Sequence, residues 1–325
     1  MKRMCSLNIK LLLIFIALFM NSPLVSCDGI LKSRNKKSLK IINTTRAGNV
    51  PYGVYTENGY AYITNNNDLL IFDIREPEKP RKMGAISTGV TFSLTVKNGL
   101  AYTVGENGYI IDVSDPTKLQ KLGDLPLQGS GHSIWVEDTL AYVATSAGLE
   151  IFNISDPARP YLVSKYGEGP ARGIVCIECI AYVANRVNGL EIINVMNPAD
   201  PQKVTTIPGT QAAWNIHVHK DYLFLGRHEY GIEIYSIKER SSPQRIGRFC
   251  DDDGGEALSV WGDDSLLFVA DNFGVEVLDI TDPMHPRQIG ELGGLGCTHD
   301  IFVEGTLLFV ASVKKGLIIL GFTPE

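Results

Sequence analysis

Residues 140–160 read LAYVATSAGLEIFNISDPARP, and versions of this stretch recur to the end of the chain. The stretch contains a short apolar segment with an Ala-Tyr pair, a glycine-bearing turn, a longer apolar segment and a corner with two prolines. Short apolar runs bounded by Gly, Asn, Asp, Ser and Pro are typical of β-strands joined by tight turns. The stretch therefore predicts one structural unit, built from strands, that is used many times.

The Ala-Tyr pair and its equivalents give the period of this unit. Their first residues are Ala61, Ala101, Ala141, Ala181, Leu223, Leu267 and Leu308. Successive spacings are 40, 40, 40, 42, 44 and 41 residues. Each unit has room for four strands and shows no helical segment, which is typical of a β-propeller blade. The sequence predicts an all-β protein, a seven-bladed propeller of four-stranded blades over residues 38–322.

The chain ends predict how the ring closes. The last unit stops near Phe322, where its fourth strand is due, and residues 39–44 (LKIINT) look like a fourth strand without a blade. Pairing these segments completes the last blade from both ends of the chain. Such closure hydrogen-bonds backbone groups that an open sheet edge would leave unpaired.

The longer strand followed by an Asp-Pro corner resembles the LVIVD repeat family of β-propellers. The corner stands as Asp115-Pro116, Asp156-Pro157, Asn197-Pro198 and Asp282-Pro283, with Glu76-Pro77 close to it. The fifth unit departs from this pattern, because Glu239-Arg240 replaces the Asp-Pro pair and only the second proline, Pro243, remains. The resemblance covers about residues 38–322 and implies a bacterial or archaeal surface protein, with no established catalytic residues. From the residues alone, we expect the corner acid to accept hydrogen bonds from the turn backbone.

Residues 1–26 have the composition of a targeting segment. Lys2, Arg3 and Lys10 precede a ten-residue apolar run, which is too short to span a bilayer comfortably. The following Leu24-Val25-Ser26-Cys27 resembles a bacterial lipobox, in which the cysteine is lipidated and becomes the new N-terminus. We predict a protein anchored to the cell envelope through Cys27, with residues 27–37 as a polar, basic tether. The alternatives are plain secretion and an uncleaved anchor.

Charge and cysteine content narrow the function classes. The net charge is −6, and removal of residues 1–26, with three cations and no acid, makes it −9. This acidic body argues against general nucleic-acid binding. Cys176 and Cys179 lack a second pair to complete a zinc or redox motif, so we expect a local disulfide or two packed thiols. Cys250 and Cys297 lie in consecutive repeats and are a candidate disulfide.

Two acidic features of the sequence are expected to be structural and not to bind a ligand. Glu150, Glu191, Glu233 and Glu276 recur within the longer strand, where we expect them to be solvated or paired across strands. The run from Asp251 to Glu256 does not match the ligand spacing of an EF-hand, so a solvated loop is favoured over a calcium site. We predict no metal and no cofactor.

One position varies strongly between the repeats, the ninth before each Ala-Tyr equivalent. In order it reads Tyr52, Phe92, His132, Arg172, Trp214, Leu258 and His299. In a propeller these residues would surround one mouth of the channel and offer aromatic faces to a sugar or base and a guanidinium to an anion. Arg186 and Arg227, from nearby loops, are candidates to join them or to pair with Glu168 and Glu229. The alternative for the ring is that its side chains plug the channel.

Within this ring, Phe92, His132, Arg172 and Trp214 form the most coherent cluster, whereas His132 and His299 lie too far round to share a metal. No Gly-x-Ser-x-Gly elbow, phosphate loop or dinucleotide fingerprint stands in a suitable context. We therefore predict a non-enzymatic, envelope-anchored platform for an unknown protein or glycan partner. The alternative is an extracytoplasmic hydrolase or lyase that acts on a carbohydrate or anionic polymer through a His132/Arg172 cluster.

Overall fold

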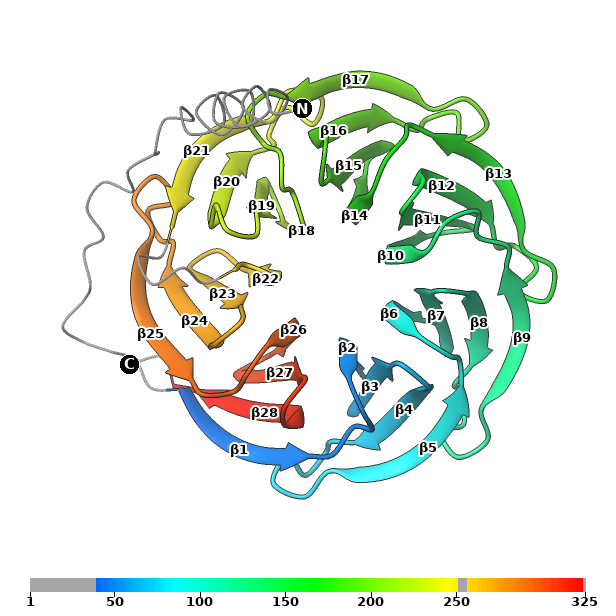
Figure 1. The fold of residues 1–325 in the computed structure, drawn as a ribbon, viewed down its shortest axis with the longest axis vertical. Helices are drawn as coiled ribbons and strands as arrows, with labels where there is room; N and C mark the ends of the chain where they lie inside the picture. The colour runs from blue at the N-terminus through cyan, green and yellow to red at the C-terminus, as the bar shows by residue number, and fades with distance from the viewer. Residues whose placement is uncertain (1–38, 251–255, 324–325) are drawn as a thin grey trace, which may run out of the picture. The chain divides into compact units, whose positions relative to one another are not determined.

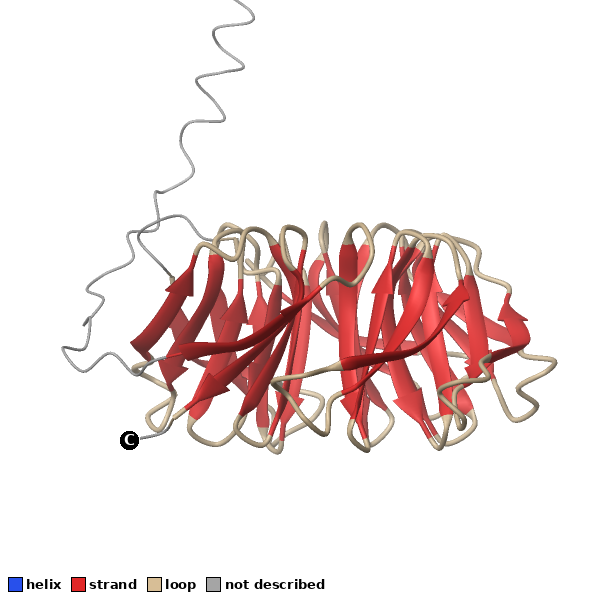
Figure 2. Ribbon diagram, turned by 90° about the horizontal axis from the view of Figure 1, so that it is seen from below, coloured by secondary structure: helices blue, strands red, loops and turns tan. Residues whose placement is uncertain are grey.

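The computed structural model describes residues 39–250 and 256–323, which form seven four-stranded antiparallel sheets around a central channel (Figure 1). Figure 2 shows this propeller from the side, with its loops gathered on two flat faces. In blades one to six the strands run from the innermost outward in chain order, as the period of the sequence predicts. The seven-bladed fold is confirmed. No helix within these residues is long and apolar enough to cross a membrane.

The strands of the first four blades follow one another without interruption. They are β2 (Pro51–Glu57), β3 (Tyr60–Asn65), β4 (Asp68–Asp73) and β5 (Arg81–Ser87); β6 (Thr91–Lys97), β7 (Leu100–Gly105), β8 (Gly108–Asp112) and β9 (Gln120–Leu125); β10 (Gly131–Glu137), β11 (Leu140–Thr145), β12 (Gly148–Asn153) and β13 (Tyr161–Tyr166); and β14 (Ala171–Ile177), β15 (Ile180–Asn185), β16 (Gly189–Asn194) and β17 (Gln202–Ile207).

The remaining three blades have the same order, and the last one borrows its outer strand from the N-terminal side. They are β18 (Asn215–His219), β19 (Tyr222–Gly226), β20 (Ile232–Ser236) and β21 (Gln244–Phe249); β22 (Ser259–Gly262), β23 (Leu266–Ala270), β24 (Gly274–Asp279) and β25 (Arg287–Gly293); and β26 (Thr298–Glu304), β27 (Leu307–Ser312), β28 (Gly316–Phe322) and β1 (Leu39–Thr45).

The closure of blade seven by both chain ends is confirmed. Strand β1 pairs antiparallel with β28, from Leu39 opposite Phe322 to Thr45 opposite Leu317. Leu39 and Phe322 are buried in the core shared by blades six and seven. Three predicted features, the targeting segment 1–26, Cys27 with its tether and the acidic residues 251–253, lie outside the described residues.

The core lies between blades because the two faces of each sheet pack on neighbouring sheets. The alanine of the Ala-Tyr pair is fully buried in blades one to four. Tyr142 of blade three packs against Ile174 and Cys176 of blade four. Apolar side chains on both faces of a strand are expected when both faces are covered. The Ala-Tyr strand is therefore part of the frame, by which we mean the packed strands and proline corners that the blades share.

The proline corners cap the blades and also join them. Asp115, Asp156, Asn197 and Asp282 each accept a hydrogen bond from the backbone N–H two residues later, which confirms the predicted role of the acid. A Cβ on Gly84 of β5 would lie 2.2 Å from the carbonyl oxygen of Pro116 in the next blade. Only glycine allows such a close approach at that strand position. In blade three, the Ser164 hydroxyl instead donates to the carbonyl of Pro198.

The recurring strand acids are buried, so the expectation that they are solvated is wrong. Glu150 accepts hydrogen bonds from the Thr145 hydroxyl and the Gln128 N–H. Glu233 pairs with Arg227 at 2.8 Å and Arg245 at 3.1 Å. A buried carboxylate is tolerated only when such partners replace water. Polar pairing, the second expected alternative, holds for these two acids.

The cysteine expectations need correction as well. Cys176, Cys179 and Cys297 are free thiols, so neither the local disulfide nor a Cys250–Cys297 bridge is present. Cys176 is packed in the core, whereas Cys179 is exposed in the hairpin turn and is not a packed thiol. Its φ of 63° and that of Glu178, 51°, are the two positive values that a type I′ hairpin turn requires.

Candidate functional site at the channel mouth

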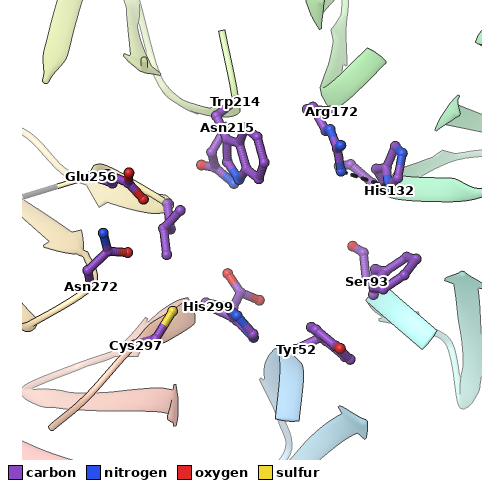
Figure 3. A pocket seen from close by; sticks show the side chains of 14 residues that line it. Tyr52, Ser93, His132, Arg172, Trp214, Asn215, Glu256, Asn272, Cys297 and His299 are labelled. Carbon is purple, nitrogen blue, oxygen red and sulfur yellow. Dashed lines mark hydrogen bonds between the residues drawn. The ribbon is translucent and has the colours of Figure 1, made fainter. Parts of the chain in front are cut away.

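All seven residues of the variable ring line one pocket, which has a volume of about 340 Å³. The pocket opens on the face that carries the loops between second and third strands, here called the upper face. Figure 3 shows labelled side chains from all parts of the ring converging on the same space. The ring therefore does not fill the channel mouth, although its members do pack against one another around the wall.

A backbone irregularity explains why the ring residues face the channel. The pairing register between first and second strands shifts at Tyr52, Phe92, His132, Arg172 and His299, each of which is skipped in the ladder. A β-bulge of this kind leaves one residue unpaired and re-aims its side chain. Trp214 and Leu258 reach the ring differently, because each lies just before the first residue of its strand.

The ring side chains form a chain of lateral contacts. The Tyr52 ring stacks on His299, with centroids 4.9 Å apart, and meets Phe92 edge-on at 5.1 Å. Phe92 lies 5.7 Å from His132. The aromatic faces are thus partly occupied by neighbours. Recognition at the centre of the pocket depends mainly on the polar atoms that point inward.

Arg172 is the most distinctive polar group of the site. Its Nη1 lies 3.3 Å from Nδ1 of His132, and its guanidinium lies 4.6 Å from the centre of the Trp214 ring. Its Nε is buried without a hydrogen-bond partner. Among residues 39–250 and 256–323, no carboxylate forms an ion pair with Arg172. Burial, with the nearby Arg186, lowers the pKa of Arg172, yet an arginine stays charged in proteins.

The structure separates the two other candidate arginines. Arg186 is exposed and does not line the pocket, but its guanidinium lies 5.6 Å from the Trp214 ring, in the same sector as Arg172. Arg227 is buried, pairs with Glu233 and donates to the Gln211 carbonyl. It does not line the pocket, and its partner is Glu233 instead of the expected Glu229 or Glu168.

Both ring histidines have altered titration. Burial, together with the Arg172 charge, lowers the pKa of His132 to about 4. Burial also lowers the pKa of His299, against the opposing effect of its hydrogen bond to the Pro51 carbonyl. Both imidazoles are therefore neutral near pH 7. Within the described part of the chain, no group of His, Cys, Asp and Glu is arranged to hold a metal ion.

The sequence comparison of ring positions missed the deeper layer of the pocket. The residue one position after the ring member also lines the pocket in four blades, as Ser93, Ser133, Asn215 and Asp300. The residues at this position are small or polar in every blade, and that composition is the sequence signal for the second layer. Glu256, Asn272 and Cys297 complete the wall near blades six and seven.

Asp300 is the buried acid of this layer. Its Oδ2 accepts a hydrogen bond from the Val54 N–H of blade one, and its Oδ1 accepts one from the Ser259 hydroxyl of blade six. Burial raises the pKa of Asp300 to about 6, although these hydrogen bonds act in the opposite direction. Asp300 thus links three blades and places a carboxyl group under the pocket.

Comparison with solved structures places the fold among β-propellers. The β-propeller domain of Cps50 (Swd1) from Myceliophteria thermophila aligns with a TM-score of 0.73 and 12% identity, over 88% of this chain and 100% of that chain. The computationally designed Ika8 protein aligns with a TM-score of 0.63 and 8% identity, over 87% and 100%. Likeness at this identity shows the fold alone. No curated protein sequence matches this chain.

The repeats themselves match a family model. LVIVD repeats are found at residues 53–88, 88–124, 128–167, 168–207, 254–292 and 295–320. Together these segments cover more than half of the chain. The gap between residues 207 and 254 contains blade five, the unit whose proline corner is replaced in the sequence. The chain belongs to the LVIVD repeat family of β-propeller proteins.

Proposed function

We propose that this protein is a non-enzymatic binding propeller that recognises an anionic group of a glycan or protein partner in the channel-mouth pocket. The observation that carries the proposal is Arg172, a partly buried guanidinium with no carboxylate partner among the described residues, at the wall of an open pocket. A desolvated charge is costly unless it is paired. A carboxylate, sulfate or phosphate group would pair it with charge-assisted hydrogen bonds.

The surroundings of Arg172 favour binding over catalysis. A general base is most efficient when its pKa lies near the working pH. The pKa of His132 is about 4, and its Nδ1 is already occupied by the hydrogen bond from Arg172. His132 and Arg172 are therefore better suited to hold an anion than to transfer protons. An envelope hydrolase or lyase built on these two residues is the weaker candidate.

We also propose that Cys27 anchors the propeller to the cell envelope, because Leu24-Val25-Ser26-Cys27 resembles a lipobox. Leu39, the first described residue, pairs with Phe322 at the end of the sheet opposite the pocket. The start of β28 lies at the pocket face, where Ser312 pairs with Gly316 and Thr298. The described chain therefore begins at the lower face of the propeller.

The binding proposal is tested with glycans that differ only in charge. Glucuronate-terminated oligosaccharides and their methyl esters are compared for binding to the purified protein and to Arg172→Gln. We expect the acid to bind and the ester to bind at least about tenfold more weakly, with Arg172→Gln losing the difference. Arg159→Gln, an exposed lower-face arginine paired with Asp156, is the matched control. Equal binding of acid and ester would contradict the proposal.

Two further measurements address catalysis and anchoring. Turnover of an acidic polymer that is lost in both His132→Ala and Arg172→Ala would favour the enzymatic alternative. For the anchor, Cys27→Ala should move the protein from the membrane fraction to the soluble fraction. Retention of this variant in the membrane fraction would show that the lipobox interpretation is wrong.

A further inference from the structure

The pocket has two walls of opposite hydrogen-bonding character. His132 and Arg172 lie on one side in Figure 3, and Glu256, Asn272 and Cys297 lie across the space from them. His299 and Asp300 complete the second wall near blade seven. Each wall can be assigned as donating or accepting from the fixed partners of its side chains, because a guanidinium can only donate and a carbonyl oxygen can only accept.

On the first wall, the tautomer of His132 is set by Arg172. The Arg172 Nη1 donates to Nδ1 of His132 over 3.3 Å, so Nδ1 must be the unprotonated nitrogen. The imidazole is neutral near pH 7, and its proton therefore sits on Nε2. His132 Nε2–H and the remaining guanidinium N–H groups make this wall a set of donors with a positive charge.

On the second wall, the tautomer of His299 is the opposite one. Nδ1 of His299 lies 3.0 Å from the carbonyl oxygen of Pro51 and must donate to it. In the neutral imidazole, Nε2 is then an acceptor. The two ring histidines have the same side chain, and burial lowers the pKa of both, yet they offer opposite hydrogen-bonding groups.

Acidic side chains reinforce the accepting character of the second wall. A carboxylate has about four acceptor positions, and Asp300 uses three of them for Val54 N–H, Ser259 Oγ–H and Ile301 N–H. Glu256 lines the same side and pairs with His228 at 3.1 Å. A simple anion would gain from Arg172 but would meet acceptors and negative charge at its far end.

We infer that the pocket takes an amphoteric ligand, with a carboxylate at Arg172 and His132 and an ammonium group at His299 and Asp300. This inference rests on the proposed anion-binding function and narrows its ligand class. The pocket volume of about 340 Å³ is near the lower end for small-molecule sites, so it suits one small molecule or one terminal residue. Because the two walls face each other, the two charged groups must stand at opposite ends of the ligand, as in an ω-amino acid.

The test uses three probes that differ by one charged group. Isothermal titration calorimetry on the full protein compares hexanoate, hexylamine and the tightest of 4-aminobutanoate, 6-aminohexanoate and 8-aminooctanoate. We expect the amino acid to bind at least about tenfold more tightly than either singly charged probe. Arg172→Gln should reduce it to the level of hexylamine. His299→Phe, which retains an aromatic ring to stack on Tyr52, should reduce it to the level of hexanoate, while Arg159→Gln should change nothing.

The outcomes separate this inference from the function on which it rests. Unchanged melting temperatures of the variants show that any loss of binding is local. Equal affinities for hexanoate and the amino acids, both lost in Arg172→Gln, would overturn the amphoteric ligand and leave anion binding intact. Absence of Arg172-dependent binding for every acid, glucuronate-terminated glycans included, would overturn both.

Discussion

Two positions in each blade, nine residues apart, differ in how much their residue type varies from one blade to the next. The alanine of the Ala-Tyr pair is identical in blades one to four and fully buried between blades. The ring position reads Tyr, Phe, His and Arg in the same four blades, and its residue is the one skipped by the strand ladder. The frame accepts little variation because both faces of its strands are packed. The bulge frees one side chain per blade from that constraint, and the pocket is built from those side chains.

Removal of the closing strand should have the largest effect on the frame. Deletion of residues 38–45 removes β1, exposes the edge of β28 and uncovers Phe322. We expect loss of cooperative unfolding or a melting temperature lower by more than about 10 °C. Deletion of residues 28–36, on the tether side, is the control and should leave the melting temperature unchanged. Equal melting temperatures for the two deletions would refute the closure as a stabilising element.

A smaller loss of stability should distinguish the buried site of Arg227 from the pocket site of Arg172. Glu233→Ala leaves the buried Arg227 without its carboxylate and also removes the partner of Tyr235 and Arg245. Breaking one partner of a buried ion pair typically costs about 3–5 kcal/mol. Arg172→Gln removes no ion pair among the described residues and should change the free energy of unfolding by less than about 1 kcal/mol. Urea denaturation of both variants measures the difference, and similar losses would contradict the distinction between frame and pocket.

The sequence predicts the frame well because the frame is repeated. Strand number, blade number and the closing role of residues 39–44 all follow from the period and from the incomplete last unit. The role of the corner acid follows from local turn chemistry. Contacts between blades do not follow in this way: the approach of Gly84 to Pro116 depends on how neighbouring sheets stack, which no local pattern records.

The ring of the site is predictable for a related reason, and its chemistry is not. A position that varies against a constant background stands out, so the sequence alone identifies all seven residues that line the pocket as a ring. Asp300 lay in the adjacent, less variable column. The burial of Glu233 and Arg227 was missed because isolated charges in a strand usually face water, and their pairing requires a loop and a strand to meet.

The smallest expected effect is on the pH dependence of stability, which should distinguish a histidine of the frame from one of the pocket. His217 packs between blades five and six, where its Nε2 bonds to the Gly262 carbonyl, and burial lowers its pKa to about 4. The unfolded chain binds a proton at about pH 6.5, whereas the folded chain does not until about pH 4. Stability is therefore full above pH 6.5 and falls on acidification, by about 2 kcal/mol for His217 between pH 7 and pH 5. His132 acts in the same direction, with a smaller effect because solvent in the pocket screens it.

Asp300 has the opposite effect on stability, in nearly the same pH range. Its folded pKa, about 6, is raised above the ordinary value of 3.8, so its contribution increases stability as pH falls from 6 toward 4. Urea midpoints at pH 7 and pH 5 should show a reduced acid loss in His217→Phe, a slightly reduced loss in His132→Phe and an increased loss in Asp300→Asn. A greater reduction in His132→Phe than in His217→Phe would mean that the pocket histidine is more tightly desolvated than the frame histidine. The channel mouth would then belong to the packed frame, and the division between the two regions would be wrong.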